Sequence, residues 1–108
     1  MTRRDEQLAA VFGALADPTR RAVLAELARA SSATATELTS AVPVTRQAVT
    51  KHLQSLSEAG LVAPTRHGRE VRYAFTPEPL EEAVGWIVGV GAQWDRRLAR
   101  LRRQLEQR

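Results

Sequence analysis

The last third of the chain carries an apolar repeat, and this repeat constrains the fold more than any other feature. Apolar positions recur with spacings of 4-3-4-3-4-3-4 along the series Leu80, Val84, Ile87, Gly91, Trp94, Leu98, Leu101 and Leu105. Alternating spacings of four and three keep one side of a helix aligned with a second helix. Residues 78–107 are therefore predicted to form a long helix whose apolar seam is covered by a partner.

The charges and glycines of this segment bear on the same prediction. Acidic residues lie at its start (Glu78, Glu81, Glu82) and basic residues near its end (Arg100, Arg102, Arg103), which matches the helix dipole. Three glycines lower the helix propensity of the middle: Gly85, Gly89 and Gly91. A kink or break between Gly89 and Gly91 therefore stays open.

Length and composition limit the class of protein. The chain has 108 residues and 11.9 kDa, which indicates one domain over residues 1–108. It has no cysteine, which excludes disulfides, thiolate metal sites and a cysteine nucleophile. The N-terminus is polar, and the most apolar stretch, residues 83–90, is far shorter than the ~20 residues of a membrane helix. A location in the cytoplasm is expected.

Four helices are expected before the last one. Leu8, Val11, Phe12 and Leu15 form one apolar face of a helix over residues 5–15. Asp17-Pro18 caps a second helix that ends near residue 29, and residues 30–33 are expected to be a loop. Thr34 and Glu37 form a capping box for a short helix that ends before Pro43. Thr45 caps the fourth, over residues 46–59, which stops at Gly60.

The apolar period then changes to two. Val71, Tyr73 and Phe75 alternate with less apolar residues, which predicts a half-buried strand. Residues 61–63 are its expected partner, and residues 64–70 form a hairpin loop that turns at His67-Gly68. The order is four helices, a hairpin and a long helix. The expected fold class is mainly α with a small β-hairpin.

The fourth helix carries the clearest chemical signal. Opposite its apolar residues lies a face of five hydrogen-bonding side chains without an acid: Arg46, Gln47, Thr50, Lys51 and Gln54. Arginine reads guanine and glutamine reads adenine bidentately in the major groove, and lysine reaches guanine or phosphate. A short helix, a tight turn and such a face make a helix-turn-helix pattern. The alternative is an ordinary solvated face.

The hairpin adds a second basic element directly after this helix. Arg66, Arg69 and Arg72 flank its glycine turn, where they are expected to contact the DNA backbone or a minor groove. The alternative is an edge hairpin protected by charge. Residues 44–76 hold five bases and two acids, a net +3 of the chain's total of +4. Most of the net charge is therefore concentrated on these two elements.

Several motifs in this order resemble the ArsR/SmtB family of bacterial winged-helix repressors. They are residues 14–21 (ALADPTRR), Glu37-Leu38, and residues 45–53 (TRQAVTKHL), 56–62 (LSEAGLV) and 68–73 (GREVRY). The resemblance implies a winged helix-turn-helix of order α-α-α-α-β-β-α. It also implies a homodimeric repressor in the bacterial cytoplasm that binds an inverted-repeat operator. Because autoregulation is common in that family, the chain's own promoter is a natural first target. Dimerisation through the first and last helices is implied as well, in agreement with the seam.

Roles follow for individual residues. Arg46, Gln47, Thr50 and Lys51 are expected to read bases, while the DNA backbone is contacted by Thr45, Gln54, Arg66, Arg69 and Arg72. The expected dimerisation residues are Leu8, Phe12, Leu80, Val84, Ile87, Trp94, Leu98 and Leu101. Trp86 and Trp94 are interpreted as dimer core, with a pocket for an apolar effector as the alternative.

The chain departs from the metal-sensing members of that family. Those members carry a cysteine pair in the short helix, where this chain has residues 37–42 (ELTSAV), or ligands that include histidine in the last helix, which here has none. His52 is expected to pack or contact DNA, and His67 lies at the hairpin tip. No metal, no cofactor and no enzymatic activity are expected, because no catalytic constellation is present. A winged-helix module that binds protein instead of DNA is the alternative function.

Overall fold

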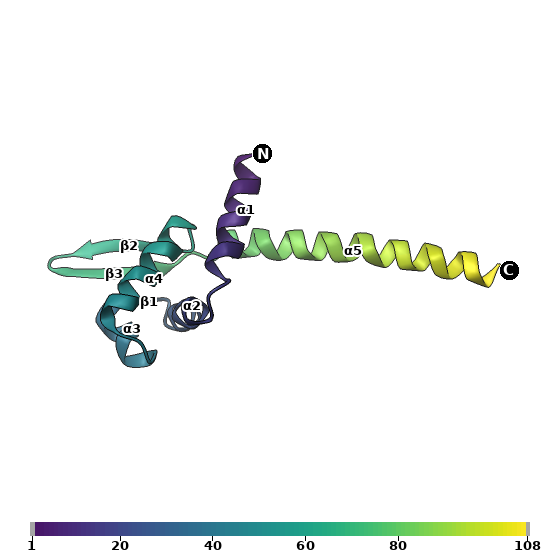
Figure 1. Ribbon diagram of the computed structural model, residues 1–108. Coiled ribbons are helices and arrows are strands. Elements are labelled where there is room, and N and C mark those ends of the chain that lie inside the picture. The colour runs from purple at the N-terminus through teal and green to yellow at the C-terminus, as the bar shows by residue number, and fades with distance from the viewer. Residues whose placement is uncertain (1, 108) are drawn as a thin grey trace.

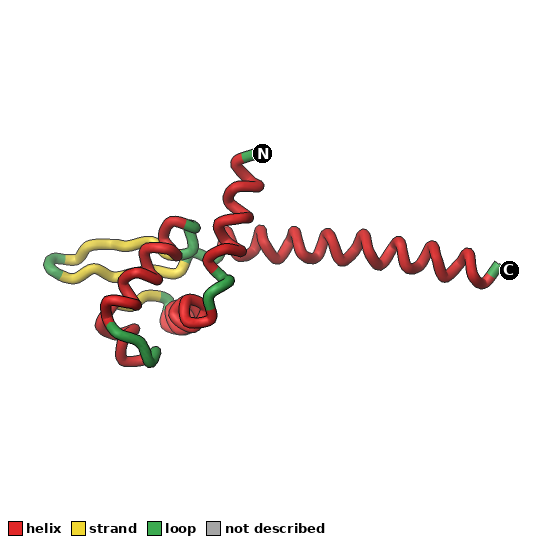
Figure 2. Tube along the Cα trace, in the orientation of Figure 1, coloured by secondary structure: helices red, strands yellow, loops and turns green. Residues whose placement is uncertain are grey.

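The computed structural model describes residues 2–107 and contains five helices and three strands among them (Figure 1). In chain order these are α1 (Arg3–Ala14), α2 (Pro18–Ala30), β1 (Ser32–Thr34), α3 (Ala35–Ala41), α4 (Arg46–Glu58), β2 (Val62–His67), β3 (Glu70–Phe75) and α5 (Glu78–Glu106). Figure 2 shows α1 to α4 and the hairpin gathered in one body, from which α5 extends. The predicted order of helices is confirmed, and one strand is added to it.

The helix starts follow the predicted caps. The Asp17 carboxylate accepts hydrogen bonds from the backbone N–H groups of Thr19 and Arg20, at 2.8 and 3.0 Å. Thr34 and Glu37 form the predicted capping box, with the Glu37 carboxylate accepting from the Thr34 N–H at 2.9 Å. These local bonds satisfy backbone groups that the first helical turn leaves unpaired, so their positions could be predicted from sequence.

The prediction of a loop over residues 30–33 is wrong at its C-terminal end. Ser32–Thr34 form β1, which pairs antiparallel with β3 through Ser32↔Ala74, Ala33↔Tyr73 and Thr34↔Arg72. The sheet therefore has three strands in the order β1-β3-β2. A strand of three residues is too short to show an alternating pattern. It forms because Ala33, which is 5% exposed, becomes part of the core.

The hairpin is longer and its turn tighter than the sequence predicted. The register of β2 and β3 runs from Val62↔Phe75 to His67↔Glu70, so the turn consists of Gly68 and Arg69. Gly68 has a φ of 64°, which a two-residue turn needs at its first position. Most of the predicted loop over residues 64–70 is therefore strand, and the arginines lie on a stiff ribbon.

The core lies where α2, α3 and α4 meet the sheet. Its fully buried side chains include Val23 and Leu27 of α2, Leu38 of α3, and Leu53 and Leu56 of α4. Val49, which is also 0% exposed, turns the same face of α4 inward. Because one side of α4 is buried in this way, its other side is held towards solvent.

α5 is one continuous helix of 29 residues, so the break considered near Gly89–Gly91 does not occur. It contacts α1 near its start, where Arg4 forms an ion pair with Glu82 at 3.9 Å and the rings of Phe12 and Trp86 meet edge to face at 5.7 Å. Beyond that contact it projects from the body (Figure 1). Only Pro79 and Ala83 of α5 are buried.

The projecting helix makes the chain elongated. Its radius of gyration is 18.9 Å and its extents are 71 × 30 × 20 Å, whereas a compact chain of this length has a radius of gyration of about 13 Å. Large apolar side chains remain exposed along α5: Val84, Trp86, Ile87, Val88, Val90, Trp94, Leu98, Leu101 and Leu105. The predicted dimerisation residues on α5 are therefore exposed except for Leu80, which, like Leu8, is partly buried against the core.

Candidate nucleic-acid interface

The outer face of α4 presents the five side chains that the sequence singled out. The helix begins after Thr45, whose hydroxyl oxygen accepts a hydrogen bond from the Ala48 N–H at 3.1 Å. One open surface is lined by the whole set: Arg46, Gln47, Thr50, Lys51 and Gln54. Each is exposed, and the burial of Val49 and Leu53 fixes the direction in which the set points. The predicted face is thus present as one continuous surface.

One member of this face has only part of its hydrogen-bonding capacity free. The hydroxyl of Thr50 donates to the backbone carbonyl of Arg46 at 3.0 Å. Its oxygen still has lone pairs to accept a hydrogen bond, and its methyl group is exposed with the rest of the side chain. Thr50 is therefore suited to accept from a base amino group or to contact a thymine methyl group.

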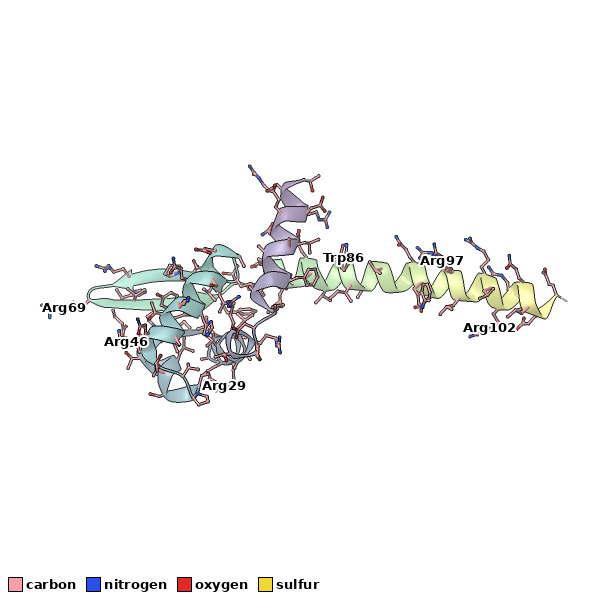
Figure 3. The ribbon with its side chains drawn as sticks, viewed as in Figure 1. Arg29, Arg46, Arg69, Trp86, Arg97 and Arg102 are labelled. Atoms are coloured by element: carbon pink, nitrogen blue, oxygen red, sulfur yellow. The ribbon has the colours of Figure 1, made fainter. Side chains whose placement is uncertain are left out.

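A cleft between α4 and the hairpin brings two of the predicted arginines together. Arg46 and Arg69 both line it, along with Thr36, Thr50 and Tyr73. Figure 3 shows Arg69 at the hairpin tip and Arg46 at the start of α4, at the same end of the molecule. Arg66 is exposed on β2 of the same hairpin. The cleft therefore has one arginine from α4 and one from the hairpin in its lining, together with the carboxylate of Glu70.

The sequence did not single out Thr36 or Tyr73 as members of this cleft. Thr36 comes from α3, the helix before the turn, and Tyr73 from the middle of β3. A signal for Thr36 was available, because the first helix of a helix-turn-helix crosses the DNA backbone. Tyr73 carried no comparable signal, since an aromatic residue in a strand is ordinarily part of the core.

Arg72 has partners within the chain. Its guanidinium lies 3.1 Å from the Glu37 carboxylate and 3.6 Å from that of Glu70, and its Nε donates to the Ser32 hydroxyl at 3.4 Å. The backbone N–H of Thr34, its hydroxyl and the charge of Arg72 together hold the pKa of Glu37 below its ordinary value. Arg72 therefore ties β3 to β1 and α3, and it differs in this from the exposed Arg66 and Arg69.

The arginines that follow the α2 cap also serve the fold. Nη1 of Arg20 donates to the carbonyls of Gly13 and Ala14 at 3.4 Å, and that of Arg21 to Leu15 at 2.6 Å. These carbonyls belong to the last turn of α1 and the residue after it, and the Gly13 carbonyl also accepts from the backbone N–H of Ala16 at 3.3 Å. Arg20 and Arg21 thus join α1 to α2.

The two histidines lie in different surroundings. Nδ1 of His52 is buried and has no hydrogen-bond partner within residues 2–107. The pKa of Asp17 is lowered chiefly by the Arg20 N–H and in smaller part by His52. His67 is exposed at the end of β2. No three potential ligands from His, Cys, Asp and Glu gather in the part of the chain that the structure describes.

None of the helices within residues 2–107 combines the length and the apolar character needed to cross a membrane.

Known proteins share this arrangement. Residues 15–65 match the family described as a helix-turn-helix domain. The chain is 42% identical to the HTH-type transcriptional regulator YuzN of Bacillus subtilis, over 72% of this chain and 92% of YuzN. It is 27% identical to the transcriptional repressor SdpR of the same organism, over 72% of this chain and 86% of SdpR.

A solved structure agrees along most of its length. An ArsR-like transcriptional regulator from Rhodococcus sp. RHA1 is 43% identical, with a TM-score of 0.79 over 89% of this chain and 90% of that one. The agreement extends from the helix-turn-helix to the remaining elements, because the match covers nearly all of both chains. The chain therefore belongs to the ArsR family of winged helix-turn-helix transcriptional regulators, which act by binding DNA.

Proposed function

We propose that the chain is a homodimeric repressor that binds an inverted-repeat operator in a bacterial cytoplasm, and that it is not an enzyme. The observation that carries this proposal is the exposed, acid-free face of α4 beside a basic hairpin. Two α4 helices of a dimer would enter successive major grooves, ~34 Å apart along the duplex. Repression is supported by the similarity to the transcriptional repressor SdpR, and the chain's own promoter is the first operator to test.

Within this proposal the side chains divide into two groups. Arg46, Gln47, Thr50 and Lys51 read bases, because they lie together on the exposed face of α4 and carry groups that can bond base edges. Thr45, Gln54, Arg66 and Arg69 contact the backbone at the margins of that surface. Arg72, which the sequence placed among the backbone contacts, does not belong to this second group, because its charge is already paired with Glu37 and Glu70.

The dimer is supported by the apolar surface that α5 exposes. Trp94, Leu98 and Leu101 are between 43% and 56% exposed, far from the core of their own chain. Phe12, 37% exposed and in contact with Trp86, extends this apolar surface onto α1. An apolar stripe of this length marks an association surface in a monomer. Residues 78–107 would then be the dimerisation segment of a single domain.

A randomised duplex library tests the DNA-reading roles. Gln47→Ala is expected to lose discrimination at one base pair of the selected operator, because glutamine reads adenine bidentately. Gln93→Ala, on α5, is the matched control and is expected to leave the selected sequence unchanged. Equal loss of affinity on all sequences for Gln47→Ala would remove its base-reading role. Failure of the wild-type chain to shift any duplex would favour the protein-binding module instead.

An apolar effector at the dimer interface is a second proposal, and it rests on the two tryptophans. Val90, Gln93, Trp94 and Arg97 line a hollow on α5 that a second copy would enclose. Trp86 and Trp94 would report binding through their fluorescence. When the dimer is titrated with a library of apolar compounds, a compound that binds is expected to quench the fluorescence of one tryptophan and to lower the affinity for the operator. If no compound does both, the tryptophans serve as dimer core only.

A further inference from the structure

The C-terminal half of α5 carries a second basic surface. Arg96, Arg100, Arg103 and Gln107 are exposed and follow one another at spacings of four, three and four residues, so they share one side of the helix, the arginine face. We propose that the arginine face binds the phosphate backbone of a second DNA duplex, so that a chain held on its operator by α4 bridges two segments of DNA. This inference rests on the proposed function for the first duplex and adds the second.

The arginine face lies opposite the seam. Arg96 and Arg100 are each two residues from the seam residue Leu98. Arg103 has the same relation to Leu101. Two residues correspond to about 200° around an α-helix, which is nearly the opposite side. A second copy that covers the seam would therefore leave the arginine face open.

The arginine face contains no acid. Within residues 93–107 the two acids, Asp95 and Glu106, share another side of the helix with Arg102, at spacings of seven and four. That side mixes both signs, as an ordinary solvated face does. None of the ion pairs within residues 2–107 uses a guanidinium of the arginine face. Within that range these groups are therefore available to an external anion.

The helix dipole does not account for this surface. Its attraction for cations is limited to the last turn of a helix, and α5 ends at Glu106. Arg103 lies in that turn. Arg100 and Arg96 are six and ten residues before the end, so the dipole does not favour them.

Positive charge gathers at two places in the chain. Residues 44–76 hold five bases and two acids, and residues 93–107 hold the same numbers, a net +3 in each. The remaining residues hold six bases and eight acids. Figure 3 shows Arg46 and Arg97, one from each region, far apart along the molecule. The second basic region is therefore separate from the surface that α4 presents to DNA.

The chemistry of the arginine face fits phosphate. Its cations are all arginines, whose planar guanidinium can bond two phosphate oxygens at once. Arg96 and Arg103 are about 10 Å apart along the helix axis, and a duplex presents about six phosphate charges over that length. A chain held on DNA by α4 also meets other segments of the same DNA at high local concentration. These points favour a duplex over a soluble anion or an acidic protein.

A bridging assay tests the arginine face. The operator duplex selected from the randomised library is fixed to beads and loaded with the full chain, and a labelled duplex without the operator is added. The wild type is expected to capture the labelled duplex. Arg96→Gln/Arg100→Gln/Arg103→Gln is expected to capture about ten-fold less or lower, with a salt slope of capture reduced by about 3. Glutamine has nearly the helix propensity of arginine, so α5 is kept.

A second triple variant controls for net charge. Arg3→Gln/Arg29→Gln/Arg102→Gln removes three exposed arginines outside the arginine face and leaves the same net charge. Both triple variants are expected to lose the same small part of the operator affinity, and only the first is expected to lose capture. Equal loss of capture in both variants would overturn the proposal, because net charge alone would then explain capture.

An anionic membrane is the competing partner. A helix with arginines on one side and tryptophan and leucine on the other also suits a lipid surface. Flotation with vesicles of phosphatidylserine and phosphatidylcholine separates the two partners, because lipid needs the seam exposed and a duplex does not. The dimer is expected to stay off the vesicles. Vesicle binding without capture of a duplex would overturn the proposal.

The outcomes separate this inference from operator binding. A wild-type chain that binds its operator but captures no second duplex overturns the role of the arginine face and leaves the proposed function standing. A chain that shifts no duplex of any sequence overturns both.

Discussion

At the scale of single residues, the hairpin arginines show how the same side chain takes different roles. Arg66 and Arg69 are exposed, with no ion-pair partner within residues 2–107. Arg72 contacts two carboxylates and a hydroxyl within its own chain. The sequence could not separate them, because the partners Glu37 and Ser32 are more than thirty residues away along the chain.

This difference predicts opposite behaviour for two matched variants. Arg69→Ala is expected to weaken binding to all duplexes alike and to reduce the slope of log affinity against log salt by about 1. Its urea midpoint should stay that of the wild type. Arg72→Ala is expected to lower the urea midpoint, because Glu37 and Ser32 lose their partner. If Arg72→Ala kept full stability but changed the salt slope, Arg72 would be a phosphate contact after all.

Glu37 also predicts how stability depends on pH. Its pKa lies below the ordinary value of 4.5 in the folded chain, chiefly because the Thr34 N–H bonds the carboxylate. A group whose pKa is lowered on folding contributes stability above its unfolded pKa, and the contribution is lost as pH falls through the folded pKa. Urea midpoints of the wild type should therefore fall below about pH 4.5 more steeply than those of Glu37→Gln. Parallel curves would show that the capping carboxylate contributes nothing.

At the scale of elements, α4 depends on its first turn as well as on its buried face. The Thr45 hydroxyl accepts from the Ala48 N–H at 3.1 Å and so pairs one of the free donors at the helix start. Thr45→Ala is expected to lower the free energy of unfolding by about 0.5–2 kcal/mol. Thr45→Ser, which keeps the acceptor, is the control. Loss in both variants would assign the effect to the methyl group.

The glycines of α5 allow a test of which side is covered by a partner. A side chain at Gly89 or Gly91 meets nothing within 4 Å in the single chain. Gly91 lies on the seam, whereas Gly89 lies outside it. Gly91→Leu is therefore expected to weaken the dimer about ten-fold or more, because overpacking is costly. Gly89→Leu should leave the dimer Kd nearly unchanged, and equal effects would contradict the assignment of faces.

At the scale of the whole molecule, shape connects association with DNA binding. The chain spans 71 Å because α5 leaves the body, and the C-terminal part of α5 extends away from α4 (Figure 1). A second copy on α5 would therefore leave both recognition faces free. This separation makes the two functions independently measurable.

A seam variant uses that independence. Leu98→Glu is expected to convert the dimer to a monomer in sedimentation, because it places like charges in an apolar contact. Binding to a complete inverted repeat should fall strongly, while the weak binding to an isolated half-site should be unchanged. Ala99→Glu, on the outer side of the same helix, is the control. Full operator affinity of a monomeric Leu98→Glu would show that dimerisation is not needed for binding.

The amino-acid sequence alone determined the features that depend on neighbouring residues. Caps at Asp17, Thr34 and Thr45, the apolar face of α4 and the seam of α5 follow from spacings of three, four or seven residues. The exposed face of α4 follows from the same periodicity, since its buried side fixes its outer side. These elements and their order were predicted correctly for that reason.

Only the tertiary structure decided the features that join distant parts of the chain. The strand β1 exists because Ala33 pairs with Tyr73. Arg72 joins β3 to α3 because the fold brings Glu37 within ion-pair distance of it. The continuity of α5 past Gly85, Gly89 and Gly91 was likewise undetermined, because glycine lowers helix propensity without forbidding a helix. Local spacing carries no information about such contacts, and each depends on the packing of the whole domain.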